Sequence, residues 1–411
     1  MSGPHCVVVG AGHAAAQLCA SLVQAKWPGR VTVIGDEPHA PYHRPPLSKT
    51  QLDASREQPL QAIRPDAFYD DNGIELLLGN RVDAIDRDAK HVRVGDRTID
   101  YDALVLATGS THHKPPIAGV EHPRVLTLQT AQQAAVVRRL AADAHSAVII
   151  GAGFIGLEVA SSLRKLRLEV TVLELAERVL SRVTCPEVSA FFARLHRDHG
   201  VDLRTGVAAE GIEERGGRLS VATKGGDAFP ADFVVIGAGA TPNVKLALDA
   251  GLEVDNGVVV NEFNQTSDPA VYAVGDCCNQ HQPRYGARMR LESVQNANDQ
   301  AKTVAAALAG EPRPHDALPW FWSDQYDVKL QIAGVSTGYD QLVLRGDPES
   351  GPPFSAWYLK DGRLLAVDAI NDPRAYAVAS RLIPARKRPD LAQVADPGAD
   401  LKMVLNTAQE S

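Results

Sequence analysis

The sequence predicts an α/β protein with two parallel sheets, each built around a glycine-rich turn, followed by a smaller α+β domain. An apolar strand, a tight glycine turn and a helix start occur in that order twice, in residues 5–15 (HCVVVGAGHAA) and 147–156 (AVIIGAGFIG). Backbone amides at such a helix start approach a pyrophosphate closely. Two such turns predict two bound dinucleotides, and hence electron transfer between them.

Length and composition limit the protein to a few classes. A chain of 411 residues predicts two or three domains, and 45% hydrophobic and 22% charged residues are ordinary for a globular protein. A formal charge of −8 argues against general nucleic-acid binding. No apolar run approaches the roughly 20 residues that span a bilayer. The first strand begins near His5, which leaves no room for a signal peptide, so we expect a cytoplasmic protein without a membrane partner.

The first turn predicts a Rossmann-like dinucleotide site. Gly10 permits the sharp bend, Gly12 lets a pyrophosphate approach, and Ala15 stands where a third glycine is usual. Asp36 is the candidate acid for the adenosine ribose, although Gly35 occupies the more usual acid position. The alternative is a tight strand-to-helix turn without a ligand. Around this turn we expect a helix over residues 14–25 and strands over 30–34 and 104–109.

The second turn has the full GxGxxG pattern of Gly151, Gly153 and Gly156, with Phe154 and Ile155 inside it. Glu174 ends the next strand. A carboxylate there accepts hydrogen bonds from ribose hydroxyls and repels a 2′-phosphate, so it favours NADH over NADPH. This half is expected to contain a helix over residues 155–166 and strands over 147–150 and 170–174, and to end in the apolar and glycine-rich run 233–239.

From about Pro319 the pattern changes to short strands and one helix. Lys360-Asp361-Gly362 is a strong hairpin signal between two apolar runs. Trp320 and Trp322 share one face of a strand, with Phe321 on the other. The predicted domains are residues 1–109 with 241–318 and residues 110–240, both Rossmann-like, and residues 319–411, an α+β domain.

Several segments resemble a known family. Residues 104–109 and 266–276 are similar to strands of the two-dinucleotide-binding flavoproteins, whose fold is glutathione-reductase-like. The sequence further resembles the NADH-dependent ferredoxin reductases of bacterial oxygenase systems, the putidaredoxin reductase type. The segments that carry this resemblance are 42–49 (YHRPPLSK), 181–206 (SRVTCPEVSAFFARLHRDHGVDLRTG), 290–298 (RLESVQNAN) and 319–334 (PWFWSDQYDVKLQIAG).

The resemblance implies that the first nucleotide site binds FAD and the second binds NADH. One family contact is missing, because Gln129 stands before Thr130 where the family commonly has arginine. Core packing is the alternative role for Val82 and Val294, and a helix N-cap is the alternative for Asp276. The implied FAD contacts are Ala14, Asp36, Lys49, Val82, Asp276 and Val294, beside Thr108 and Gly109 at the end of their strand.

The resemblance also implies the chemistry, in which NADH delivers hydride to flavin N5. It places Lys49 and Glu158 beside that contact, for which the alternative is a plain structural ion pair. Phe154 resembles the aromatic residue that shields the flavin until nicotinamide displaces it; the alternative is core packing. Trp322 is the candidate at the electron exit.

The cysteines indicate the route of the electrons. Cys6, Cys19, Cys185, Cys277 and Cys278 form neither CxxC nor CxxxxC. The adjacent Cys277 and Cys278 are either two packed thiols or a strained disulfide. Without a thiol relay, single electrons pass outward, and the resemblance implies a 2Fe–2S ferredoxin that feeds a haem-thiolate monooxygenase or a Rieske dioxygenase.

A basic cluster of Arg381, Arg386, Lys387 and Arg388 is the candidate docking patch for an acidic ferredoxin, or simply a solvated helix end. The pairs His112–His113 and His196/His199 lack metal-binding partners, so we expect no metal site. Two further functions stay open: a rubredoxin reductase or NADH oxidase, and a redox-sensing binding protein switched by NADH.

Overall fold

The structure is a computed structural model that describes residues 3–53 and 58–408. Contacts within the chain divide it into two compact units. The first unit comprises Met1–His43, Leu60–Thr111 and Thr241–Pro319, and the second comprises Arg44–Pro59, His112–Ala240 and Trp320–Ser411. The second unit therefore holds both the predicted NADH domain and the predicted C-terminal domain, and the boundary between these two stays a prediction.

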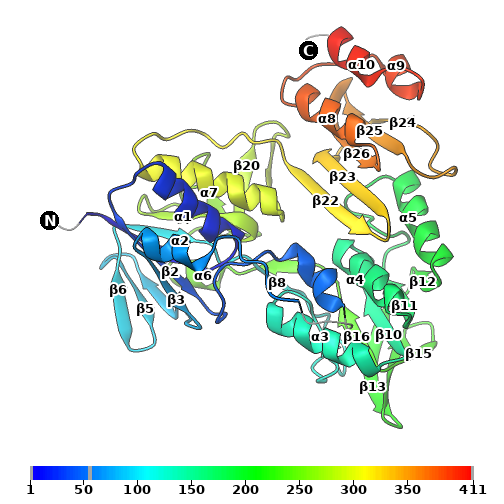
Figure 1. Cartoon of the computed structure of the whole chain (residues 1–411), viewed down its shortest axis with the longest axis horizontal. Coiled ribbons are helices and arrows are strands. Elements are labelled where there is room, and N and C mark those ends of the chain that lie inside the picture. The colour runs from blue at the N-terminus through cyan, green and yellow to red at the C-terminus, as the bar shows by residue number, and fades with distance from the viewer. Residues whose placement is uncertain (1–2, 54–57, 409–411) are drawn as a thin grey trace. The chain divides into compact units, whose positions relative to one another are not determined.

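The first unit is built on a parallel sheet with the strand order β3-β2-β1-β7-β19. Helices α1 (His13–Gln24) and α7 (Val294–Leu308) lie side by side (Figure 1). Their small apolar side chains, such as Ala15 and Ala301, pack on one face of the sheet. The strands are β1 (His5–Val9), β2 (Arg30–Gly35), β3 (Ile74–Leu78), β7 (Ala103–Leu106) and β19 (Val271–Ala273).

The other face of this sheet forms a second core with two three-stranded sheets, one antiparallel and one mixed. Val7, Leu104 and Leu106 point into that core, as the alternation of side chains along a strand requires. The remaining elements of the first unit are α2 (Asp66–Asp71), β4 (Ala84–Asp86), β5 (His91–Val94), β6 (Arg97–Asp100), α6 (Lys245–Asp249), β18 (Val258–Val260), η3 (Gly275–Cys277), β20 (Cys278–Gln282) and β21 (Ala287–Met289).

The second unit repeats the plan with the parallel order β12-β11-β10-β16-β9. The registers also correspond: Val9 pairs with Ile34 in the first sheet, and Ile150 pairs with Leu173 in the second. Its elements are β9 (Val125–Leu126), α3 (Ala131–Asp143), β10 (Ser146–Ile150), α4 (Phe154–Lys165), β11 (Glu169–Glu174), α5 (Pro186–Asp198), β12 (Val201–Thr205), β13 (Ala209–Arg215), β14 (Arg218–Thr223), β15 (Ala228–Ala231) and β16 (Phe233–Ile236).

The second unit also contains the proline-rich segment and the C-terminal antiparallel sheet, in the order β22-β23-β26-β25-β24. Asp361 and Gly362 both have positive φ, 50° and 73°, as a two-residue hairpin turn requires. These elements are η1 (Pro45–Ser48), η2 (Thr50–Leu52), β22 (Trp320–Gln325), β23 (Val328–Gly334), β24 (Gln341–Arg345), β25 (Phe354–Lys360), β26 (Arg363–Ile370), α8 (Pro373–Leu382), α9 (Leu391–Ala395) and α10 (Leu401–Thr407).

The predicted fold class is confirmed: two dinucleotide-type α/β sheets and a C-terminal α+β part. Helices α9 and α10 were not predicted. The chain passes between the units through β8 (Ser110–His112) and β17 (Ala240–Pro242). Within residues 3–53 and 58–408, no helix combines the length and the apolar character needed to cross a membrane.

Candidate functional site

The first glycine turn is shaped by close backbone contacts. Gly10 has φ 111°, and a Cβ atom there would lie 2.2 Å from the carbonyl oxygen of Ala107. Its amide donates to the carbonyl of Ile34 at 2.7 Å, which ties the turn to the neighbouring strand. Gly12 is the N-cap of α1 and, lacking a side chain, provides no side-chain cap. Only glycine fits at position 10 in this turn.

The second turn has the same geometry. Gly151 has φ 106°, a Cβ there would lie 2.5 Å from the Gly237 carbonyl oxygen, and its amide donates to the Leu173 carbonyl at 2.8 Å. Gly156 is tighter still, because its Cβ would come within 2.0 Å of the Gly151 carbonyl oxygen. Gly153 is the N-cap of α4 and again provides no side-chain cap.

The starts of α1 and α4 differ from those of α3, α7 and α8. Thr130, Ser293 and Asp372 accept hydrogen bonds from backbone amides at the starts of α3, α7 and α8. After the two glycine turns no side chain takes this role. A pyrophosphate fits such an end, both by hydrogen bonding and by the helix dipole.

The residues at the two predicted ribose positions differ. Glu174 is half-buried, and its carboxylate accepts hydrogen bonds from the amides of Ala152 at 2.5 Å and Ala176 at 2.8 Å. These bonds hold the carboxylate at the end of β11, beside the second turn. In the first unit Asp36 is exposed, and at Gly35 a Cβ would lie 2.5 Å from the Cβ of Ala11.

One further residue lies beside the predicted ribose position of the second unit, and the sequence analysis did not single it out. Leu175, directly after Glu174, is 72% exposed, the largest exposed fraction among the exposed large hydrophobic side chains of the described residues. Its apolar side chain is therefore exposed beside the predicted ribose position at Glu174.

The other predicted FAD contacts in the first unit lie on or near the sheet. The Thr108 hydroxyl donates to the carbonyl of Asn243 at 2.8 Å, and Gly109 has φ 65°. Asp276, in η3, accepts a hydrogen bond from Ser110 at 3.2 Å. The alternative of a helix N-cap for Asp276 is wrong, because η3 is followed by strand β20.

The remaining first-unit candidates are apolar. Val82 and Ala14 are buried, at 3% and 6% exposure, and Val294 is half-buried at the start of α7. Val82 belongs to the core on one face of the sheet, so packing accounts for its burial without a ligand.

Lys49 and Glu158 are brought together in the second unit. The Lys49 ammonium lies 2.6 Å from a carboxylate oxygen of Glu158, whose side chain is only 4% exposed. The same oxygen accepts a hydrogen bond from Ser48 at 2.5 Å, and the other oxygen accepts one from Ser323 at 2.7 Å. The predicted pair is thus an ion pair between a buried carboxylate and a half-buried lysine, with two hydroxyl donors that the sequence analysis missed.

Aromatic side chains connect the second turn to β22. The ring of Phe154 lies 4.5 Å from that of Phe321, and the rings of Trp320 and Trp322 lie 5.4 Å apart. Trp320 and Trp322 share a face of the strand, as predicted. All four side chains are half-buried, so each keeps part of its surface accessible.

Gln129, the departure from the family pattern, lies beside the proline-rich segment. Its carbonyl accepts a hydrogen bond from the Arg44 guanidinium at 2.7 Å, and its side-chain oxygen accepts one from the His112 amide at 3.3 Å. Burial and the nearby Arg44 charge lower the pKa of His112. A positive charge is therefore present next to position 129, supplied by another residue.

The five cysteines are free and buried. Burial raises the pKa of Cys6, Cys277 and Cys278, and raises the pKa of Cys185 to about 11, which keeps these thiols protonated and unreactive. Cys277 and Cys278 are packed thiols in this structure. Within the described part of the chain, no cluster of three or more His, Cys, Asp or Glu side chains is arranged to hold a metal.

The basic cluster lies on and after α8. Arg381, Arg386 and Arg388 are exposed, and Lys387 is half-buried. These side chains form a positive stretch at the surface of a chain whose formal charge is −8.

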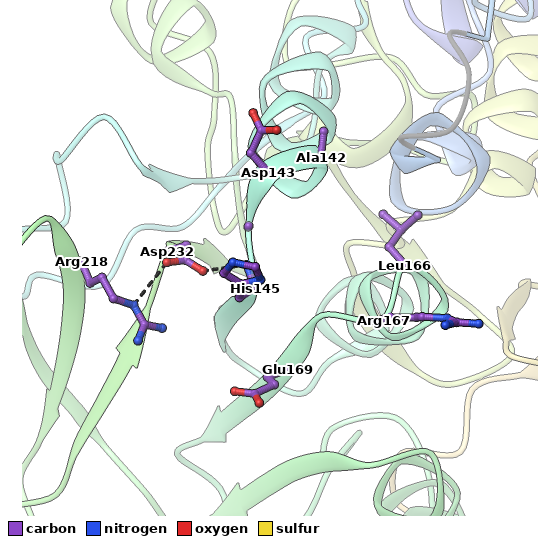
Figure 2. Close-up of a pocket in the computed structure, with 9 residues that line it drawn as sticks. Ala142, Asp143, His145, Leu166, Arg167, Glu169, Arg218 and Asp232 are labelled. Carbon is purple, nitrogen blue, oxygen red and sulfur yellow. Dashed lines mark hydrogen bonds and ion pairs between the residues drawn. The ribbon is translucent and has the colours of Figure 1, made fainter.

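A pocket of about 700 Å³ lies elsewhere in the second unit (Figure 2). Its lining includes His145, Glu169 and Asp232, which stand at the starts of β10, β11 and β16. The glycine turn follows the opposite, carboxyl end of β10. Dinucleotides bind at the carboxyl ends of parallel strands, so this pocket is not the dinucleotide site.

Comparisons with known proteins cover nearly the whole chain. The family model described as pyridine nucleotide-disulphide oxidoreductase matches residues 4–301, and one described as reductase C-terminal matches residues 320–405. The chain is 42% identical over 401 residues to rhodocoxin reductase of Rhodococcus erythropolis, covering 97% of this chain and 94% of that protein.

Two further comparisons agree with these. The chain is 41% identical over 411 residues to the ferredoxin–NAD(+) reductase component of the anthranilate 1,2-dioxygenase system of Burkholderia cepacia, covering 98% of this chain and all of that protein. The structure superposes on the reductase in the covalent putidaredoxin reductase–putidaredoxin complex with a TM-score of 0.95 and 41% identity, over 99% of each chain. The chain therefore belongs to the pyridine nucleotide-disulphide oxidoreductase family and, within it, to the ferredoxin reductases.

Proposed function

We propose that this protein is an NADH-dependent ferredoxin reductase that contains FAD. The observation that carries the proposal is the pair of glycine turns, each followed by a helix start without a side-chain cap. The comparisons support it, because the relatives named above are reductases of ferredoxin-type proteins. The buried, protonated cysteines argue against a disulfide relay between the two nucleotides.

FAD would be held by the first unit. Its pyrophosphate would lie at Gly10 and Gly12, and Asp276 would face the sugar-alcohol chain that links phosphate and ring. A flavin supplies the chemistry that joins a two-electron hydride donor to one-electron acceptors. The chain's own contribution is to bind and orient it. Ala14, Ala15, Asp36, Val82, Thr108, Gly109 and Val294 complete the proposed FAD site in the first unit. Lys49, the remaining candidate contact, belongs to the second unit.

NADH would be held by the second unit, with its pyrophosphate at Gly151, Gly153 and Gly156. The Glu174 carboxylate is already held by hydrogen bonds from two backbone amides. It can therefore accept hydrogen bonds from the ribose hydroxyls without reorganisation. Its charge repels a 2′-phosphate, so NADH is the preferred coenzyme. Phe154 and Ile155 line the approach of the nicotinamide. Lys49, Glu158 and Trp322 are the proposed catalytic residues.

The electron acceptor would be a 2Fe–2S ferredoxin that serves a haem-thiolate monooxygenase or a Rieske dioxygenase, in the cytoplasm. We propose that Arg381, Arg386, Lys387 and Arg388 receive its acidic surface. Reversing the charges of Arg381 and Arg388 should raise the KM for ferredoxin about tenfold and flatten its salt dependence, with kcat nearly unchanged. Lys224→Glu, an exposed change far along the chain, is the control.

The deciding experiment measures which acceptor the NADH-reduced protein uses. Rapid cytochrome c reduction that depends on added ferredoxin, with NADH strongly preferred over NADPH, supports the proposal. Equal rates with oxygen or rubredoxin would replace it by a rubredoxin reductase or NADH oxidase. A long-lived NADH-reduced complex without a fast acceptor would replace it by a redox-sensing protein. A colourless preparation that takes up no added flavin would reject all three.

A further inference from the structure

A chain of buried polar side chains leads from Glu158 through the second unit. Ser323 and Gln325 lie on the buried face of β22, at 1% and 0% exposure. Ser323 contacts the Glu158 carboxylate at 2.7 Å, and the Gln325 amide nitrogen donates to the Ser323 oxygen at 3.2 Å. His196, fully buried on α5, lies 2.8 Å from the Gln325 side-chain oxygen. Burying this many polar groups is costly unless each is satisfied.

The direction of each bond in this chain follows from its chemistry. The Ser323 hydroxyl donates a hydrogen bond to the carboxylate, so the Ser323 oxygen accepts one from the Gln325 side-chain amide. The Gln325 oxygen then needs a donor, which must be Nε2–H of His196. Burial lowers the pKa of His196 to about 4, so its ring is neutral and Nδ1 is an acceptor. The Tyr326 hydroxyl, 3.4 Å from Nδ1, is the group placed to donate to it.

All of these donors point toward Glu158. The carboxylate also accepts from Ser48 and Lys49, so it receives two hydroxyl hydrogen bonds and one ion pair. The chain does not conduct protons, because the amide of Gln325 stands in it and a carboxamide does not exchange its N–H for an O–H readily. Instead, the chain of hydrogen bonds fixes the orientation of the Glu158 carboxylate, and the residues that form it come from segments far apart in the sequence.

We infer that Ser323, Gln325 and His196 are positioning residues that hold the Glu158 carboxylate as a fixed, charged partner for Lys49. Removing Ser323 leaves one carboxylate oxygen buried without its donor, and the oxygen turns toward any remaining partner. The ammonium of Lys49 then loses its set position. The inference deepens the proposed function, because that function places Lys49 and Glu158 beside the reacting nicotinamide.

The first test needs no cofactor. A double-mutant cycle of Ser323→Ala and Glu158→Gln on the full chain is followed by denaturant unfolding and tryptophan fluorescence. Three of the four tryptophans, Trp320, Trp322 and Trp357, lie in the C-terminal sheet, and Trp27 lies in the first unit. Most of the signal therefore reports on the unit that contains the chain of hydrogen bonds. We expect coupling of about tenfold in the unfolding equilibrium constant. Additive effects of the two changes would overturn the inference.

Ser355→Ala is the matched control, since Ser355 is equally buried in the same sheet and bonds to Asp372 and Trp357 instead. It should cost stability without coupling to Glu158→Gln. His196→Phe should show weaker coupling than Ser323→Ala, because its effect must pass through Gln325. Coupling of Ser355→Ala as strong as that of Ser323→Ala would also contradict the inference.

The second test measures reduction of the bound flavin by NADH in single turnovers. Ser323→Ala should slow reduction about tenfold while the NADH dissociation constant changes less than about twofold, because misplacing a group costs rate rather than binding. Ser323→Thr, which keeps the hydroxyl, should restore the rate. Wild-type protein that NADH does not reduce would refute the proposed function and leave the coupling result standing. A normal rate in Ser323→Ala would refute the positioning role alone.

Discussion

The two glycine turns share one backbone geometry but differ in how tightly they close. In the first, Ala15 occupies the third position and its Cβ is buried in the core. In the second, Gly156 has the corresponding place, and a Cβ there would meet the Gly151 carbonyl at 2.0 Å. The backbone around Gly156 therefore leaves no room for a Cβ, whereas the backbone around Ala15 does. The same motif tolerates a methyl group in one sheet and excludes it in the other.

The turns differ again where the second strand ends. Strand pairing makes Gly35 the counterpart of Glu174, since Ile34 and Leu173 hold matching registers with β1 and β10. Only the second unit has a carboxylate fixed by amides at this position. Asp36 corresponds to the exposed Leu175, one residue further on. Two copies of one fold have thus become suited to different dinucleotides through a few side chains.

The largest expected effect comes from Gly156→Ala. The added methyl group must displace the turn or the helix, which should cost several kcal/mol in unfolding free energy and weaken NADH binding at least about tenfold. Unfolding curves and NADH titration measure both. Ala15→Gly, the converse change in the first turn, should cost only about 1 kcal/mol, because it removes one buried methyl group and adds backbone freedom. Equal losses for the two variants would erase the difference between the turns.

The next largest effect is expected from Glu174→Ala. Losing the carboxylate removes the acceptor for the ribose hydroxyls and the repulsion of a 2′-phosphate. The KM for NADH should rise, and the preference for NADH over NADPH should fall about tenfold or more. Steady-state rates with both coenzymes are the measurement. An unchanged coenzyme preference would remove Glu174 from the ribose site, and Asp36→Ala is the control that should leave this preference alone.

A smaller effect concerns the acids that begin the central strands. Asp102 accepts the amide of His5 at 2.7 Å, and Asp232 accepts the amides of His145 at 2.8 Å and Ser146 at 2.9 Å. Partial burial alone would raise the pKa of Asp232. The hydrogen bonds from the His145 and Ser146 amides and the charge of Arg218 outweigh this effect and lower the pKa.

A lowered pKa stabilises the fold above the unfolded value of 3.8, and that stability is lost as pH falls through the folded value. Asp232→Asn should therefore cost about 1–2 kcal/mol at pH 7 and much less in acid. Unfolding at several pH values measures it. A cost that stays constant down to low pH would show that charge plays no part at this strand start.

The smallest effect is expected from Asp36→Ala. The carboxylate is exposed, and an exposed charge contributes less than about 1 kcal/mol. FAD retention on dilution should change less than about threefold, measured by flavin fluorescence. A large loss of flavin would mean that Asp36, despite its different register, does in the first turn what Glu174 does in the second.

Local sequence predicted most of the fold, because its signals depend on neighbouring residues. The helices begun by Gly12 and Gly153 and the Asp361-Gly362 hairpin appear where strand, turn and helix patterns placed them. Helices α9 and α10 escaped notice because they are short and have little apolar periodicity. The antiparallel sheets β4-β5-β6 and β13-β14-β15 escaped for a similar reason.

The candidate site was predictable only in part. Lys49 and Glu158 were paired by resemblance, and the structure gives that pair a distance and a partner set. Ser323 and Gln325 alternate along β22 in the way that a solvent-facing row does, yet they are the buried row. No pattern within the strand reveals that these two side chains are buried, because their partners Glu158 and His196 come from helices α4 and α5.

By itself, the sequence determined the two pyrophosphate turns, since φ above zero and the room for a Cβ are properties of single residues and their neighbours. It also determined the carboxylate at the end of β11 that we propose distinguishes the coenzymes. Only the tertiary structure decided which polar groups are buried together around Glu158. Hydrogen bonds and ion pairs act over a few ångströms in space, whereas the residues that form them here are more than a hundred positions apart in the chain.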